Sequence, residues 1–284
     1  MEKARRLMVE EGRQGTRLDV FLARELELTR RYARRLLVRG GVTLDGRRAR
    51  AGDLLRAGQR VGLPEFRHPS EGPAADPELV LAALAERDGL LAVDKPAGVP
   101  SHPLDCDQTG TALNAVLAIW PRIAGVGSGA ERGLVHRLDV HTSGVLVFAT
   151  EPGAWAAARS AFRRREVAKR YLARVHGRLR GSGEIRLRLA NRGARVAVRE
   201  DEGREAVSRF RALETGAEES LVEIEPLTGV RHQIRASLSQ RGHPVVGDRL
   251  YGSTTKLDRH LLHAAWIRIG GFEASAPLPA GFGG

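Results

Sequence analysis

Apolar residues recur close to the helical period near the start of the chain, between residues 16 and 39. A first helix is predicted from four such positions, Leu18, Phe21, Leu22 and Leu26. Thr16 is its expected N-cap, and Thr29 is the expected N-cap of a second helix. At about 100° per residue, the second helix gathers its apolar residues on one face: Ala33, Leu36 and Leu37. The pattern indicates two short amphipathic helices.

Short strands are expected after the second helix, which Gly40-Gly41 ends. The stretch from Val42 to Gly46 predicts a strand and a tight turn. Residues 64–77 hold four prolines and no periodic apolar pattern, which is typical of a linker. The pattern therefore separates a small domain, residues 1–63, from a larger one that begins at residue 78.

A buried strand is predicted at 145–149, where Val-Leu-Val-Phe-Ala follows Gly144. Asp139 stands shortly before this strand. Taken alone, Asp139 is explained by an ion pair with Arg137, and Thr142-Ser143-Gly144 by a turn. Spacing alone favours that structural interpretation.

The rest of the chain, residues 78–284, alternates predicted strands with scattered helices, which favours an α+β fold. The chain has 284 residues, of which 42% are hydrophobic. This is enough for one large core with a small appended domain.

The net charge of +12 and the pI near 11.0 predict a polyanionic partner. Residues 1–63 hold 16 Lys and Arg against 8 Asp and Glu, a net charge of +8. Five arginines lie opposite the apolar face of the second helix: Arg30, Arg31, Arg34, Arg35 and Arg39. Such a face is usually only solvated, but no acidic residue lies between positions 28 and 44, and this favours contact with phosphates.

Cys106 is the only cysteine, which excludes an internal disulfide and a multi-cysteine zinc site. His260 and His263 lack a third ligand at a recognised spacing, so we expect no metal. No apolar run reaches the ~20 residues that cross a bilayer, and the charged start is unlike a signal peptide. We expect a cytoplasmic, monomeric protein without a membrane partner.

Four segments resemble, in the right order, the motifs of RluA-type RNA pseudouridine synthases. The most specific is His136-Arg137-Leu138-Asp139, followed two residues later by Thr142-Ser143-Gly144. The others are the Asp94-Lys95-Pro96-Ala97-Gly98 turn, Lys169-Arg170-Tyr171, and His232-Gln233-Ile234-Arg235 with the later Gly242-His243-Pro244. The resemblance spans residues 78 to about 270.

The resemblance implies an isomerase that converts uridine in RNA to pseudouridine without a cofactor. It also implies a mixed, largely antiparallel sheet with a central active-site cleft. Asp139 matches the catalytic aspartate of the family, Arg235 matches the arginine that pairs with it, and Tyr171 matches the active-site tyrosine.

A uridine in structured RNA must be flipped out to reach such an aspartate, at a cost of a few kcal/mol. Arg137 matches a residue that enters the RNA in the family, and His136 is expected to shape the loop. Lys95 and Lys169 are candidates for phosphate contacts.

The small domain resembles an S4 RNA-binding domain in its Arg-rich second helix and in the turn from Gly40 to Gly46. This implies docking on the RNA backbone without recognition of bases. Family members with such a domain look mostly like modifiers of large-subunit ribosomal RNA, whereas several without it act on transfer RNA. We therefore predict ribosomal RNA as the substrate, with transfer RNA as the alternative.

One position departs from the family pattern. An arginine usually follows Thr-Gly directly, whereas Val230 stands there and Arg231 comes next. The shift bears on a secondary RNA or loop contact and leaves His232 to Arg235 in register.

Two other classes of function remain alternatives. A non-catalytic ribosome assembly factor would not need Asp139, Tyr171 and Arg235 together, yet all three are present. A hydrolase or nuclease would need a metal or a second carboxylate near Asp139. Asp94 and Asp248 are the motif-borne candidates, and their turn-like contexts favour the isomerase.

Overall fold

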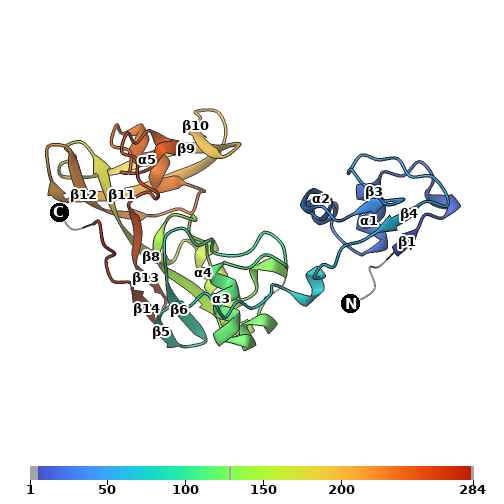
Figure 1. Ribbon diagram of the computed structural model, residues 1–284. Helices are drawn as coiled ribbons and strands as arrows, with labels where there is room; N and C mark the ends of the chain where they lie inside the picture. Colours follow the sequence, from blue (N-terminus) through green and yellow to red (C-terminus); the bar gives the residue numbers. More distant parts are fainter. Residues whose placement is uncertain (1–5, 128, 283–284) are drawn as a thin grey trace. The chain divides into compact units, whose positions relative to one another are not determined.

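The computed structural model describes residues 6–127 and 129–282 and divides the chain into two compact units (Figure 1). The small unit comprises Met1–Gly72 and Asp105–Asp107, and the large unit comprises Pro73–Leu104 and Gln108–Gly284. Residues 1–5 and 283–284, which the predicted domains include, lie outside the described residues.

The small unit packs two helices, α1 (Leu18–Glu25) and α2 (Arg30–Arg39), against a four-stranded antiparallel sheet. The strand order is β1 (Arg6–Met8), β4 (Arg60–Gly62), β2 (Thr43–Leu44) and β3 (Arg47–Arg48). A single-turn 3₁₀ helix, η1, spans Glu11–Arg13. The predicted apolar faces of both helices lie in one core, so the amphipathic pattern is confirmed.

The two predicted helix caps had different outcomes. Thr29 caps α2, because its hydroxyl accepts the Tyr32 backbone N–H at 3.2 Å. The prediction for Thr16 was wrong, since α1 begins after Arg17 without a side-chain cap. Arg17 forms an isolated β-bridge with Leu54, which keeps the backbone extended one residue further.

The first part of the predicted linker is an ordered part of the small unit. The Tyr32 hydroxyl donates to the Arg67 carbonyl at 2.8 Å, and His68 Nε2 lies 2.9 Å from the Leu26 carbonyl. A 3₁₀ helix, η2 (Pro69–Glu71), follows. The small unit therefore continues past residue 63 to Gly72, because long-range polar contacts hold residues that carry no periodic pattern.

The large unit is built on a ten-stranded mixed sheet, which confirms the predicted fold class. Nine strands follow the order β10-β9-β11-β12-β8-β13-β7-β6-β5, and β14 pairs with β13. All pairings are antiparallel except that of β13 with β7. The strands are β5 (Ala83–Arg87), β6 (Leu90–Lys95), β7 (Ser143–Ala149), β8 (Val167–His176), β9 (Ser182–Arg192), β10 (Arg195–Val198), β11 (Arg204–Thr215), β12 (Glu219–Pro226), β13 (Leu262–Ile269) and β14 (Phe272–Ser275).

In its described residues the large unit has three α-helices: α3 (Ala112–Ile119), α4 (Pro152–Arg164) and α5 (Gln233–Gln240). Figure 1 shows α5 beside β9 and β10, at the far end of the sheet from β5. Short 3₁₀ turns lie at Pro121–Gly125, Gly129–Glu131 and Arg249–Tyr251. Among the described residues, no helix combines the length and apolar character needed to span a membrane.

Strand β7 is buried along its whole length, as its continuous apolar run predicts. Leu146 and Phe148 pack in the core that includes α3, whereas Val145 and Val147 pack in the core beside α4. Because both faces are covered, β7 is a fixed support for the loop that precedes it.

Gly144 of β7 lies opposite Ala264 of β13, where the two backbones leave no room for a side chain. Its φ is +108°, and a Cβ there would lie 2.2 Å from the Ala264 carbonyl oxygen. We expect Gly144→Ala to lower the free energy of unfolding by about 2 kcal/mol or more, measured by urea denaturation. Gly153→Ala in α4 is the control, since a Cβ at Gly153 meets nothing within 4 Å beyond its chain neighbours and its own helix backbone. Equal stability of the two variants would contradict the close approach.

Candidate active site

Asp139 lies in the loop that leads into β7. Its backbone carbonyl accepts the Thr142 N–H at 3.0 Å, which closes a turn. The Ser101 hydroxyl holds the preceding residue by bonding both the N–H and the carbonyl of Leu138. The Asp139 side chain is 29% exposed. The carboxylate therefore reaches solvent from a backbone that is held on both sides.

The guanidinium of Arg235, on α5, joins Asp139 to a second carboxylate. Arg235 Nη1 donates to Asp139 Oδ2 at 2.9 Å. Its Nε and Nη2 donate to the two oxygens of Asp248 at 2.6 and 2.9 Å. Burial lowers the pKa of Arg235, but Asp248 and then Asp139 raise it more, so the net pKa is raised. The structure thus brings together Asp139 and Arg235, the two residues expected to pair.

Asp248 is the site residue whose role the sequence did not indicate. Its side chain is only 1% exposed, and it neutralises Arg235 rather than facing a substrate. It therefore does not supply the accessible second carboxylate that a nuclease would need. Its turn-like Gly-Asp context carries no signal for a partner thirteen residues away.

Tyr171 lies half-buried on β8, opposite Ala264 of β13. It packs against the apolar clusters on both sides of this point. Burial, and next the charge of Asp139, raise the pKa of the phenol. Tyr171 is thus a neutral aromatic group close enough to Asp139 to feel its charge.

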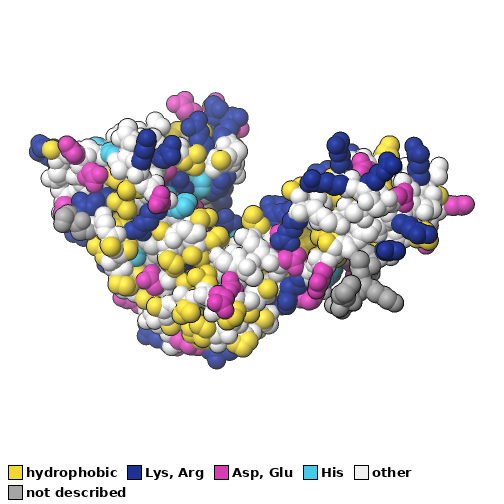
Figure 2. Space-filling view, viewed as in Figure 1, with side chains coloured by type: hydrophobic (Ala, Val, Ile, Leu, Met, Phe, Trp, Pro, Cys, Tyr) yellow, Lys and Arg dark blue, Asp and Glu magenta, His cyan; other side chains and the backbone are white. Residues whose placement is uncertain are grey.

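Two histidines line the same site. His232 Nε2 lies 3.9 Å from Asp139 Oδ2, and His232 Nδ1 lies 3.0 Å from the Tyr251 hydroxyl. His260 Nε2 lies 2.9 Å from the Thr142 hydroxyl. In Figure 2, histidine and basic side chains gather in a hollowed part of the large unit. No group of three His, Cys, Asp or Glu within 6–127 and 129–282 is arranged to hold a metal ion.

Helix α5 starts at Gln233, directly after His232 at its N-cap. His232 adopts a left-handed conformation with φ 52°, which interrupts the helical backbone. The Gln233 side chain accepts from the Val230 N–H and the Thr228 hydroxyl, so a turn replaces the first helical residues. The displaced Arg231 donates to the carbonyls of Gly193 and Ala194 and ties the β9–β10 hairpin to this turn.

Lys95 does not fit the predicted role of contacting phosphate. It is fully buried, and its ammonium donates to the carbonyls of Pro96, Val99 and Val140 at 2.8, 2.7 and 3.1 Å. Burial lowers its pKa to about 7, although Asp139 and Asp94 oppose this shift. Because Val140 follows Asp139, Lys95 holds the loop that carries Asp139 from inside.

The other motif residues lie along the same loop and on β8. His136 Nε2 accepts the Val147 N–H at 3.2 Å, and its ring stacks on Phe162 at 5.2 Å. Burial lowers the pKa of His136 to about 3, so the ring is a neutral acceptor that shapes the loop. Arg137 is exposed. Lys169 Nζ lies 5.6 Å from the Phe162 ring centre, and burial lowers its pKa to about 8.

Several arginines of α2 have partners within the small unit. Arg30 and Arg34 bond the fully buried carboxylate of Asp19 at 3.0 and 2.7 Å. Burial raises the pKa of Asp19, but the arginines, Arg34 foremost, lower it strongly overall. Arg39 pairs with Asp105 and Asp107. Arg31 is exposed and Arg35 half-buried.

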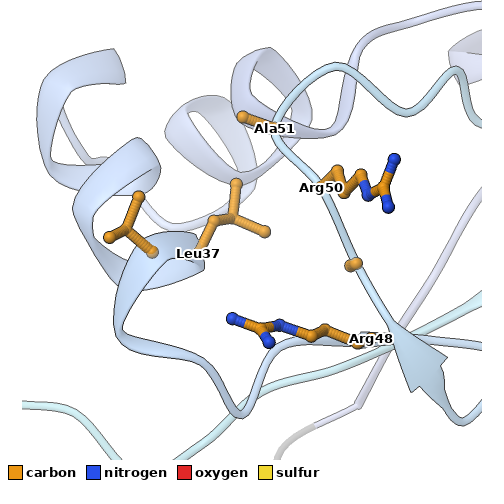
Figure 3. A pocket seen from close by; sticks show the side chains of 6 residues that line it. Leu37, Arg48, Arg50 and Ala51 are labelled. Carbon is orange, nitrogen blue, oxygen red and sulfur yellow. The ribbon is translucent and has the colours of Figure 1, made fainter.

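A pocket of about 380 Å³ opens beside α2 in the small unit. Figure 3 shows Arg48 extending from the strand side toward the helix that carries Leu37. Arg48 and Arg50 are both exposed. Neither arginine is among the RNA contacts that the sequence predicted.

Acid is expected to destabilise the fold through the buried histidines. Burial lowers the pKa of His260 to about 3 and that of His263 to about 4, from an ordinary 6.5. Between the lowered pKa and pH 6.5, the folded state binds fewer protons than the unfolded state. The free energy of unfolding is therefore highest above pH 6.5 and decreases as the pH falls below it. Each histidine should lower the free energy of unfolding by about 2 kcal/mol by pH 5.

Urea unfolding of the wild type and His260→Gln at pH 7 and pH 5 measures this effect. The variant should lose about 2 kcal/mol less on acidification than the wild type. The same loss in both proteins would show that His260 does not titrate as its burial requires.

Comparisons with known proteins agree with the fold and identify the family. The family model of RNA pseudouridylate synthase matches residues 89–240, and that of the S4 domain matches residues 16–61. Ribosomal large subunit pseudouridine synthase D of Xanthomonas campestris is 34% identical over 276 residues, which cover 96% of this chain and 82% of the relative. An RNA pseudouridine synthase of Chloroflexus aurantiacus is 36% identical, covering 93% and 87%.

A solved structure shares the fold of the large unit. Human RNA pseudouridylate synthase domain containing 1 superposes with a TM-score of 0.58 at 27% identity, covering 69% of this chain and 83% of the human one. The chain therefore belongs to the RNA pseudouridylate synthase family, carries an S4 domain at residues 16–61, and is an RNA pseudouridine synthase.

Proposed function

We propose that this enzyme converts uridines of large-subunit ribosomal RNA to pseudouridine, with Asp139 as the catalytic residue. The observation that carries the proposal is the partly exposed Asp139 carboxylate, 2.9 Å from a guanidinium that Asp248 already neutralises. The ribosomal substrate is supported by relatives named ribosomal large subunit pseudouridine synthase D and by the S4 domain.

The reaction breaks the N1–C1′ bond, turns the uracil and joins C5 to C1′. The C5 proton leaves and N1 gains a proton, so no oxidant or energy source is consumed. Asp139 serves as the nucleophile, adding either to the base or at C1′. Arg235 stabilises the negative charge of Asp139 and fixes its direction, since Asp248 holds the other side of the guanidinium.

Tyr171 is suited to stack on the target uracil. Its raised pKa makes the phenolate rare, so its placement favours stacking over acting as a strong base. The aromatic ring and the surrounding apolar side chains also retain the detached uracil during its rotation.

The target uridine reaches Asp139 by flipping out of the RNA. Arg137 is exposed two residues before Asp139, and we assign it to the space that the nucleotide leaves. His136, stacked on Phe162, fixes the backbone from which Arg137 extends. Lys169, unlike the buried Lys95, is partly exposed, so we assign it a phosphate contact.

The small unit supplies affinity for the RNA backbone. Figure 2 shows Lys and Arg side chains at several places on its visible face. The α2 arginines, Arg31 and Arg35 among them, and the pocket arginines Arg48 and Arg50 form the proposed phosphate contacts. We propose that the enzyme acts as a monomer in the cytoplasm. Transfer RNA is the alternative substrate.

Asp139→Asn should abolish pseudouridine formation, because the amide retains the shape of the carboxylate but is a poor nucleophile. Cells lacking the protein would be complemented with the wild type or with the variant, and pseudouridines mapped in ribosomal and transfer RNA. We expect a wild-type-dependent modification in large-subunit ribosomal RNA and none with the variant. A wild-type-dependent site in transfer RNA alone would make transfer RNA the substrate. Pseudouridine formed by the variant would show that Asp139 is not the catalytic residue.

Arg48→Ala with Arg50→Ala should weaken RNA binding about tenfold and reduce the salt slope of log Kd by about 1.5. Filter binding from 50 to 200 mM salt, roughly the range in which such contacts weaken, measures both quantities. Arg209→Ala with Arg211→Ala is the control with the same change in charge, since Glu184 and Glu223 compensate these arginines. Equal effects of the two pairs would show that the pocket makes no particular contact.

A further inference from the structure

The turn behind Asp139 is held by side chains from residues 259–263. The Thr142 hydroxyl lies 2.9 Å from His260 Nε2, and the Ser143 hydroxyl lies 2.9 Å from His263 Nδ1. Arg259 Nη1 donates to the same Ser143 hydroxyl at 3.4 Å. Because Thr142 and Ser143 are buried, these contacts fix where the turn lies against the start of β13.

Arg259 is held in turn by the C-terminal segment. Its Nη2 donates to the Ala280 carbonyl at 2.9 Å, and its guanidinium carbon lies 5.9 Å from the centre of the Phe282 ring. The Phe282 carbonyl accepts two N–H groups of Arg174, on β8, at 2.9 and 2.6 Å. The segment is thus bonded to β8 and to Arg259 by its backbone.

Phe282 anchors the segment in the core. Its side chain is fully buried and packs with three apolar residues, Leu221, Val246 and Leu261. Its ring also meets that of His263, with centres 6.0 Å apart. Phe282 therefore contacts both side chains that bond Ser143, namely Arg259 and His263.

We infer that Phe282 is a positioning residue for pseudouridine formation. It holds Arg259 and His263, these hold Ser143, and the turn at Thr142 and Ser143 sets the position of Asp139 relative to Arg235. The inference rests on the proposed catalytic role of Asp139. Residues 259–282 lie outside the span that the family model matches, so the match does not account for them.

A positioning residue affects the chemical step more than the binding of RNA. A displacement near 1 Å at a reacting group can cost on the order of 100-fold in rate. RNA affinity comes from basic side chains elsewhere, so it should be unaffected. We expect Phe282→Ala to lower kcat roughly 10- to 100-fold with KM nearly unchanged. Phe282→Leu, which refills much of the space, should restore most of kcat.

Phe272→Ala is the matched control for the loss of a buried phenylalanine. Phe272 is 1% exposed and pairs with Ile269, six residues along β13 from His263. It should lower the melting temperature about as much as Phe282→Ala while leaving kcat unchanged.

Hydrogen–deuterium exchange of a peptide covering 139–144 provides a readout that needs no RNA. Below the melting temperature, these amides should exchange faster in Phe282→Ala than in the wild type or Phe272→Ala. Turnover would be measured as tritium release from C5-labelled uridine in unmodified large-subunit ribosomal RNA and transfer RNA transcripts.

The results separate the two proposals. Unchanged exchange at 139–144, or equal loss of kcat in Phe282→Ala and Phe272→Ala, would overturn the positioning role. A wild-type enzyme inactive on the ribosomal transcript would overturn the proposed substrate, while the exchange experiment would still decide the role of Phe282.

Discussion

The active site depends on the burial of one guanidinium, that of Arg235. A buried charge is tolerated when it is paired and its hydrogen bonds are satisfied. Asp248 satisfies two donors of Arg235 inside the protein, and Asp139 takes a third at the surface of the site. The three groups carry a net charge of −1, and the only accessible member is Asp139. The protein can therefore present a fixed carboxylate without an uncompensated charge in its interior.

The same need for satisfied buried charges shapes the loop that carries Asp139. Lys95 is buried completely, and its ammonium finds three backbone carbonyls, including that of Val140. Breaking these contacts would leave the buried N–H donors of Lys95 without acceptors, and this cost holds the loop in place. Strand β7, covered on both faces, then fixes the other end of the loop.

The sequence predicted the parts of the site that short motifs carry, and it missed those that depend on distant partners. Asp139 and Arg235 stand in recognisable segments, and the structure pairs them over 96 residues. Nothing near Asp248 or Lys95 in the sequence shows that either is buried, because burial is decided by elements far along the chain. Likewise, Thr16 has the right residue type for a cap, but the bridge between Arg17 and Leu54 moved the helix start.

The small unit shows why counting charges overstates an RNA-binding surface. Asp19 is fully buried, and Arg17, Arg30 and Arg34 surround its carboxylate. Part of the arginine density on α2 is thus explained by one buried acid. Each of these arginines is still 44–51% exposed, so it can serve the fold and still project toward a phosphate. Arginine suits this double use, because its planar group offers five donors and one carboxylate occupies only some of them.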